Sequence, residues 1–164
     1  MIELVRYAGL ALICLCAVLI SHRYAAYSRR RNDEGRGFHQ LLVHLRGRIR
    51  TSLEPIPRAV RGFTNEALEA LGFLAALREG ENIYDAYLGV EERTALASDT
   101  RGLLSETFRE LGKSSREETL TLIEVRSSEL EELVRRDTEE GERSVKLTRT
   151  LLYAAALGAV ILFI

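Results

Sequence analysis

The sequence is poor in several residue types that mark particular classes of protein. Among its 164 residues there are no tryptophans, one methionine, two prolines and two cysteines, Cys14 and Cys16. A C-x-C pair inside an apolar run cannot form the disulfide framework of a small secreted domain, and it lacks the further ligands of a zinc site. We therefore expect both side chains to fill apolar space.

Recognisable catalytic patterns are also missing. The chain has no G-x-x-x-x-G-K-[ST] phosphate loop, and Gly35-Arg36-Gly37 is too short for a dinucleotide-binding fingerprint. His39 and His44 are five residues apart, which points them to different faces of a helix. Adjacent acids such as Glu117-Glu118 are typical of a solvated helix surface. We expect no enzymatic activity, no cofactor and no bound metal.

Charge is nearly absent from residues 4–20 and 147–164, which hold one arginine each, Arg6 and Arg149. A membrane-spanning helix needs roughly 17–25 mainly apolar residues, and an arginine near its edge can reach the headgroups. Both runs therefore predict transmembrane helices. Burial in the core of a soluble protein is disfavoured because the second run is apolar on all sides. A cleaved signal peptide is disfavoured because basic residues follow the first run.

Basic residues flank the inner side of both runs: Arg23, Arg29, Arg30, Arg31, Arg143, Lys146 and Arg149. By the positive-inside rule, we expect the middle of the chain to be cytoplasmic and both termini to reach the far side of one membrane. The same residues are expected to contact anionic lipid headgroups. The predicted organisation is an N-terminal anchor over residues 1–22, a basic linker over 23–37, a cytoplasmic bundle over 38–142 and a C-terminal transmembrane helix over 143–164.

Residues 38–142 predict an all-α bundle of about five to six helices, because apolar residues recur at helical spacing and no segment alternates with period two. Pro57 opens a short second helix that continues to Val60. The apolar stripe of the first helix consists of Phe38, Leu41, Leu42, Leu45 and Ile49.

Polar residues and glycines predict where the next helices begin and end. Asn65 caps a third helix, which carries leucines up to position 77 and ends at Gly80. Asn82 starts a fourth helix, and Asp99 or Thr100 starts a fifth. These elements all lie within the predicted bundle.

A long last helix begins with a capping box of Ser115 and Glu118, for which Ser114 and Glu117 offer an alternative one residue earlier. No helix-breaking residue occurs before Gly141. Its apolar stripe consists of Leu120, Ile123, Leu130 and Val134.

Charge is unevenly distributed between these helices. Residues 22–62 contain ten arginines against three acids, whereas residues 63–142 contain nine basic residues against twenty acids. Nucleic-acid binding is disfavoured because the basic section is short and has no interleaved aromatic residues. The acidic section either faces away from anionic lipid or docks a basic partner protein. The predicted docking residues are Glu117, Glu124, Glu129 and Glu131.

Three segments resemble those of a known family. Leu111-Gly112-Lys113-Ser114-Ser115-Arg116-Glu117-Glu118 is similar to an L-G-x-[ST]-[DS]-x-E turn before a Glu-rich helix. Lys146-Leu147-Thr148-Arg149-Thr150-Leu151 is similar to a K-L-x-R-[ST]-L segment before an apolar end. Residues 53–59, with Pro55 and Pro57, resemble a T-P-L-P-E-A-L turn, with Glu54, Ile56 and Arg58 in place of its Thr, first Leu and Glu. Together with the overall layout, they resemble the stage III sporulation protein AB family of endospore-forming bacteria.

This resemblance implies a non-enzymatic structural subunit with a bundle similar to the cytoplasmic domain of F-type platform proteins in type II secretion. It implies a place in the channel complex between mother cell and forespore, in the mother-cell membrane facing the forespore. The implied partners are the other subunits and a hexameric secretion-type ATPase, and a homo-oligomer is compatible with this role. The alternative is a membrane-tethered sensor or signalling module that dimerises through the stripe from Leu120 to Val134.

Overall fold

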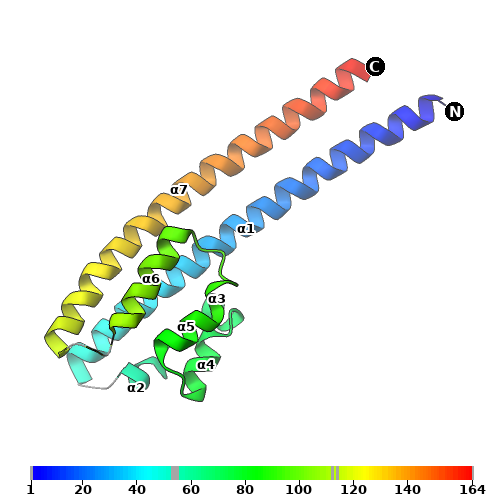
Figure 1. Ribbon diagram of the computed structural model, residues 1–164. Coiled ribbons are helices and arrows are strands. Elements are labelled where there is room, and N and C mark those ends of the chain that lie inside the picture. Colours follow the sequence, from blue (N-terminus) through cyan, green and yellow to red (C-terminus); the bar gives the residue numbers. More distant parts are fainter. Residues whose placement is uncertain (1, 53–55, 112, 114, 164) are drawn as a thin grey trace. The chain divides into compact units, whose positions relative to one another are not determined.

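The computed structural model describes residues 2–52, 56–111, 113 and 115–163 (Figure 1). Within these ranges, nothing is described of the side chains of residues 2–14, 17, 52, 57, 156 and 159–163. All the regular secondary structure of the described part is helical, which confirms the all-α prediction. The helices are α1 (Ile2–Ser52), α2 (Ile56–Val60), α3 (Glu66–Ala70), α4 (Phe73–Glu79), α5 (Ile83–Glu91), α6 (Ser98–Glu110) and α7 (Arg116–Phe163).

The chain divides into two compact units, one of which corresponds to the predicted bundle. Unit 1 comprises Met1–Arg29 and Thr138–Ile164, and unit 2 comprises Arg30–Asp137. Unit 2 therefore begins within the predicted linker and ends before the predicted boundary at residue 142. Segments of α1 and α7 contribute to both units, while α2 to α6 belong to unit 2.

The helix α1 is continuous, so the prediction of a linker over residues 23–37 is wrong. The two glycines that suggested a linker are positions of close packing. A Cβ atom at Gly35 would lie 2.8 Å from Cγ2 of Val134, and one at Gly37 would lie 2.8 Å from Oδ1 of Asn65. Glycine at these positions lets neighbouring segments approach the helix backbone, at a cost of roughly 0.5–1 kcal/mol each in helix stability.

The helices α3 and α5 begin at the predicted caps. Oδ1 of Asn65 accepts a hydrogen bond from the backbone N–H three residues later, and Oδ1 of Asn82 from the N–H two residues later, both at 3.2 Å. The predicted third helix is two helices, because Gly72 adopts a left-handed conformation (φ 84°) between α3 and α4. Gly80 (φ 101°) ends α4, as predicted.

The helix α2 runs from Ile56 to Val60, with Pro57 as its second residue, and Pro55 lies outside the described residues. His44 of α1 helps to hold this region. Its Nε2 atom is 3.1 Å from the carbonyl oxygen of Ala59, and its ring centroid is 5.3 Å from that of Phe63. His44 is therefore a structural residue.

The capping box at the start of α7 is confirmed. The backbone N–H of Ser115 donates to Oε2 of Glu118 at 2.9 Å, and the N–H of Glu118 donates to Oγ of Ser115 at 3.4 Å. Ser114 and Gly112, which belong to the same predicted motif, lie outside the described residues. The helix continues through Gly141 to Phe163.

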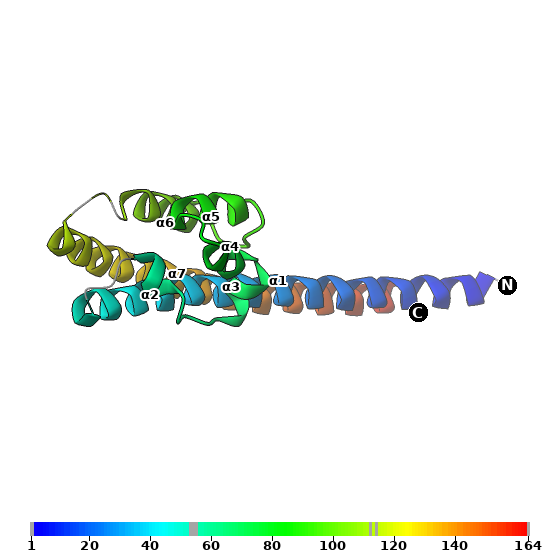
Figure 2. The same cartoon turned by 90° about the horizontal axis from the view of Figure 1, so that it is seen from below.

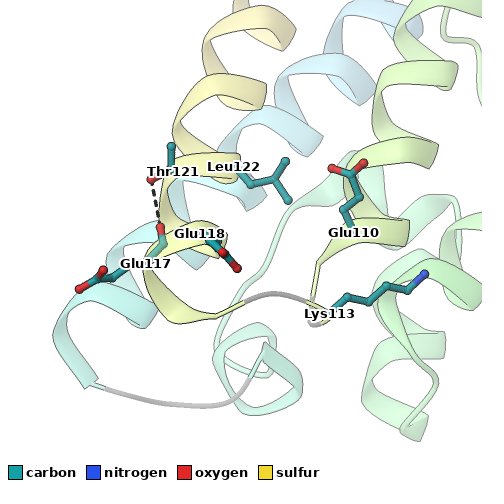
Figure 3. Close-up of a pocket in the computed structure, with 6 residues that line it drawn as sticks. All are labelled: Glu110, Lys113, Glu117, Glu118, Thr121 and Leu122. Carbon is teal, nitrogen blue, oxygen red and sulfur yellow. Dashed lines mark hydrogen bonds between the residues drawn. The ribbon is translucent and has the colours of Figure 1, made fainter.

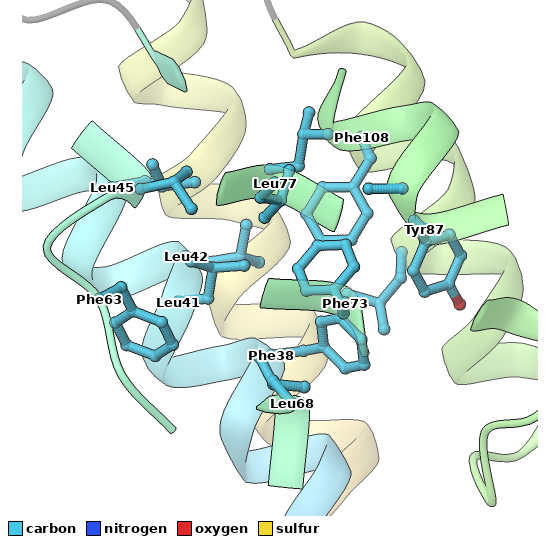
Figure 4. Packing of buried hydrophobic residues seen from close by; sticks show 14 of the residues in the cluster. Phe38, Leu41, Leu42, Leu45, Phe63, Leu68, Phe73, Leu77, Tyr87 and Phe108 are labelled. Atoms are coloured by element: carbon cyan, nitrogen blue, oxygen red, sulfur yellow. The ribbon is translucent and has the colours of Figure 1, made fainter. Parts of the chain in front are cut away.

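Four buried aromatic rings from different helices form the centre of the unit 2 core (Figure 4). Phe38 of α1 contacts Phe73 of α4 and Tyr87 of α5 edge-on, with ring centroids at 5.3 and 5.6 Å. Phe108 of α6 lies 5.2 Å from Tyr87. The predicted apolar stripe of α1 surrounds these rings and is fully part of the core. Edge-to-face contacts of this kind fix the four helices against one another.

No helix in the described part of the chain is both long and apolar enough for a membrane span. The side chains of residues 4–14 and 159–163, which belong to the two predicted spans, are outside the description.

Candidate functional site

A set of polar contacts in unit 2 surrounds the start of α7. Nη2 of Arg116 donates to the carbonyl oxygens of Ile49 and Arg50, both at 2.9 Å, and its Nε donates to that of Ile49 at 3.2 Å. The last turn of α1 has carbonyls without helical partners and a partial negative charge, so a guanidinium stabilises it. Arg116 is part of the predicted family motif, but the sequence does not indicate which helix end it reaches.

An open pocket lies beside this turn, between the end of α6 and the first turns of α7 (Figure 3). Its volume is about 550 Å³, and it is lined by Glu110, Lys113, Glu117, Glu118, Thr121 and Leu122. The carboxylate of Glu118 already caps its own helix. With three carboxylates and one ammonium group, the surroundings favour a cationic group of a partner over an anionic ligand. Within the described residues, no group of His, Cys, Asp and Glu is suited to a metal ion.

Three of the four predicted docking acids lie on one exposed stripe of α7. Glu117, Glu124 and Glu131 are seven residues apart, which places them on the same side of a helix. Two of them meet basic residues of α1 within unit 2: Glu124 is 2.9 Å from Nη2 of Arg46, and Glu131 is 4.0 Å from Nε2 of His39. Exposed pairs of this kind contribute only about 0–1 kcal/mol each.

The fourth docking acid, Glu129, lies on a different side of α7. Arg126 reaches both Glu129, at 2.9 Å, and Glu106 of α6, at 3.5 Å. Further along, the carboxylate of Glu132 accepts hydrogen bonds from Arg135 at 2.7 and 3.1 Å, and these bonds hold the pKa of Glu132 below its usual range. The predicted docking set is therefore divided between two surfaces.

The apolar stripe of α7 is used inside unit 2. Ile123 and Leu130 are fully buried, and Leu120 and Val134 pack against the same core. The signalling alternative predicted a dimer through this stripe, and that interface is not available.

A family model matches this chain. The family model of stage III sporulation protein AB matches residues 6–164. The chain belongs to the stage III sporulation protein AB family. No curated protein and no solved structure matches it.

Membership of the stage III sporulation protein AB family indicates a role in the stage III sporulation complex, together with other subunits. The matched residues include all of unit 2, unit 1 from residue 6 on, and all three motif segments. In this family member, Leu111 is buried at the end of α6, and Ser115, Arg116 and Glu118 fix the turn into α7. The motif residues Lys146, Leu147 and Arg149 are exposed in unit 1.

The basic residues predicted to contact lipid fall into two groups. Nε of Arg30 donates to Glu34 at 2.7 Å, and Arg31 is 2.7 Å from Asp137, so these two arginines stabilise unit 2 itself. The others are exposed in unit 1: Arg23, Arg29, Arg143, Lys146 and Arg149.

Glu34 is the most important polar residue that the sequence did not reveal. Its Oε2 accepts a hydrogen bond of 2.6 Å from the N–H of Ala95, and its Oε1 accepts from Arg30. Nη2 of Arg30 also donates to the carbonyl of Arg93 at 2.9 Å. Glu34 is 1 % exposed, so the loop between α5 and α6 is attached to α1 by a buried carboxylate. A single acid in a polar segment gives no sequence signal for such a role.

Proposed function

We propose that this protein is a non-enzymatic membrane platform subunit of the stage III sporulation complex, similar to the F-type platform proteins of type II secretion. Both apolar ends anchor it in the mother-cell membrane facing the forespore, and unit 2 is cytoplasmic. There it docks other subunits of the complex and a hexameric secretion-type ATPase. Family membership supports the assignment to the complex, and the absence of catalytic motifs from the sequence supports a structural role.

The arrangement of unit 1 is the observation that carries the membrane proposal. Two contacts between its helices involve polar or small residues: the hydroxyl of Tyr24 is 2.8 Å from Oγ of Ser144, and Gly141 lies against Ser28. Seven of its described aliphatic side chains are each more than half exposed: Leu15, Val18, Leu19, Ile20, Leu147, Leu151 and Leu157. Small and polar contacts between helices with apolar side chains outside are typical of helices packed in lipid.

Cysteine labelling in sporulating cells tests the topology. Cys14 and Cys16 are replaced by alanine, and Glu92, an exposed residue of unit 2, by cysteine. We expect a membrane-impermeant maleimide to label Glu92→Cys only after lysis, and the chain to stay in the membrane fraction after a high-salt wash. Labelling in intact cells, or release by salt, contradicts the proposal.

Charge reversal, with one acid changed on each of the two surfaces of α7, tests the docking of partners to the acidic residues of unit 2. Because opposite charges across an interface favour association, Glu117→Lys combined with Glu129→Lys is expected to reduce co-purification of other subunits and the ATPase at least about tenfold. Glu79→Lys, a charge reversal at an exposed position of α4, is the control and is expected to leave co-purification intact. Equal recovery with the double variant and the control contradicts docking through these acids.

A further inference from the structure

One face of unit 2 combines a basic stripe and an acidic stripe on neighbouring helices. On α1, exposed residues recur at intervals of three and four: Arg36, Gln40, Val43, Gly47 and Arg50. On α7, exposed residues recur in the same way: Glu117, Thr121, Glu124, Ser128, Glu131 and Arg135. The contacts of Arg46 with Glu124 and of His39 with Glu131 join the two stripes into one surface, which we term the α1/α7 face. In unit 2 the two helices run side by side in both views (Figures 1 and 2).

Gly47 leaves open space on this face. A glycine within a helix is less stable than an alanine, and Gly47 is exposed near the middle of the stripe. A Cβ atom at Gly47 would meet no described atom within 4 Å, whereas one at Gly35 or Gly37 would collide with its neighbours. Gly89 of α5 and Gly102 of α6 are likewise exposed without a close described neighbour, so Gly47 does not by itself require a partner, but it leaves room for the backbone of a second helix to approach this face. Val43, which is 50 % exposed beside it, offers apolar surface for the same contact.

We propose that the α1/α7 face binds the same face of a second copy of this chain. The geometry follows from the register of α1 and α7 within unit 2. The helices are antiparallel, and the numbers of facing residues, such as Arg31 with Asp137 and Arg46 with Glu124, add to between 168 and 170. A two-fold axis parallel to the helices places α1 of one copy against α7 of the other in the same antiparallel register.

In that register the two stripes are complementary along their whole length. At each end of the stripes, an arginine of one copy faces a glutamate of the other. The facing pairs between these ends consist mainly of small, apolar or uncharged residues. Within three residues of that register, with numbers that add to 167 or 168, the facing pairs are Arg50 with Glu117, Gly47 with Thr121, Val43 with the methylene groups of Glu124, Gln40 with Ser128, and Arg36 with Glu131. A face roughly 20 Å long and two helices wide is small for a permanent dimer, so we expect weak, reversible association.

Charge reversal with rescue tests the proposal on the full chain in detergent. Sedimentation of the unmodified protein is expected to show a concentration-dependent equilibrium between monomer and dimer. Arg50→Glu and Glu117→Arg each place two like-charge contacts in the symmetric dimer, and each is expected to raise the dissociation constant about tenfold or more. Combining both substitutions in one chain restores opposite charges and returns the constant close to its original value. The matched controls Arg109→Glu and Glu79→Arg, exposed on α6 and α4, leave it unchanged.

Cysteine cross-linking identifies the register independently. In a chain with Cys14→Ala and Cys16→Ala, the variants Gly47→Cys and Thr121→Cys are prepared separately and then mixed. We expect a disulfide-linked dimer only in the mixture, because each new thiol faces the other position in the partner copy. A protein that stays monomeric at every concentration overturns the proposal and leaves the face to a different partner. The proposal is also overturned if Arg50→Glu leaves the dissociation constant of the dimer unchanged, or if Thr121→Cys forms a disulfide-linked dimer without Gly47→Cys.

Discussion

At the scale of single residues, Glu34 is the side chain whose replacement is expected to have the largest local effect. Glu34→Gln puts an amide N–H₂ against either the N–H of Ala95 or the guanidinium of Arg30, so one charge-assisted hydrogen bond becomes a contact between donors. We expect the free energy of unfolding to fall by about 1.5–3 kcal/mol. Urea unfolding followed by circular dichroism measures this, with exposed Glu81→Gln as the control. Equal stability of the two variants would show that the buried carboxylate does not hold the loop.

Tyr87 makes stability depend on pH in the alkaline range. Burial raises the pKa of Tyr87 above its usual value of 10.0, with Glu91 adding to the rise and Arg101 opposing it. Above about pH 10 the unfolded chain releases the Tyr87 proton while the folded protein still holds it. The free energy of unfolding is therefore at its full value below about pH 10 and falls as the pH rises further. Tyr87→Phe removes this dependence. It also removes the 3.2 Å hydrogen bond to the carbonyl of Arg101, which costs about 0.5–1.5 kcal/mol at neutral pH.

Thermal unfolding of both proteins between pH 8 and pH 11 tests this prediction. The difference in stability between Tyr87→Phe and the original protein is expected to shrink and then reverse as the pH rises above about 10. A constant difference across the range contradicts it.

At the scale of elements, the sequence predicts helix beginnings well and interruptions poorly. Asn65, Asn82 and Ser115 act where predicted, because a cap depends on atoms two or three residues away. Glycine is ambiguous, since its role depends on distant neighbours. Gly72 divides a helix that looked continuous, whereas Gly35 lies in a helix that looked interrupted, because Val134 approaches from far along the chain. For the same reason, the contact of Arg116 with α1 could not be predicted. The division of the docking acids, in contrast, follows from their spacing along a helix and was open to prediction from the sequence.

The packing of α1 against α7 in unit 2 is expected to depend on the small size of Gly35. In Gly35→Ala the new methyl group would lie 2.8 Å from Cγ2 of Val134, so overpacking lowers the free energy of unfolding by about 1–3 kcal/mol despite better helix propensity. Adding Val134→Ala makes room for the methyl group and recovers part of the loss, which a double-mutant cycle measures as coupling of about 0.5–3 kcal/mol.

Gly102→Ala on α6 is the matched control for helix propensity. A Cβ atom there would meet no described atom within 4 Å, so this change raises the free energy of unfolding by about 0.5–1 kcal/mol. Destabilisation of similar size at both glycines would mean that contact with Val134 is not the reason for Gly35.

At the scale of the whole molecule, the two units are held by different forces. Unit 2 buries its apolar side chains around four aromatic rings, whereas the described apolar side chains of unit 1 are largely exposed. Exposing apolar surface to water costs about 25 cal/mol for each Å². Unit 1 is therefore stabilised by any surroundings that remove its apolar side chains from water. Changes to its outward side chains should therefore alter where the protein resides without altering how unit 2 folds.

Aspartate substitutions in unit 1 test this separation. Val18 and Leu157 are 55 % and 63 % exposed, so Val18→Asp with Leu157→Asp removes little packing within the chain, and the unfolding temperature of unit 2 should stay the same. In lipid, an aspartate costs about 2.5–3.5 kcal/mol near the centre of a span, as at Leu157, and less near its end, as at Val18. If the proposed anchoring holds, the variant is therefore expected to shift from the membrane to the soluble fraction. Alanine at the same two positions is the control and stays in the membrane. Membrane retention of the aspartate variant would mean that these side chains do not face lipid. A lower unfolding temperature would mean instead that they stabilise the fold directly, so fractionation and calorimetry together distinguish an anchor from a structural extension of unit 2.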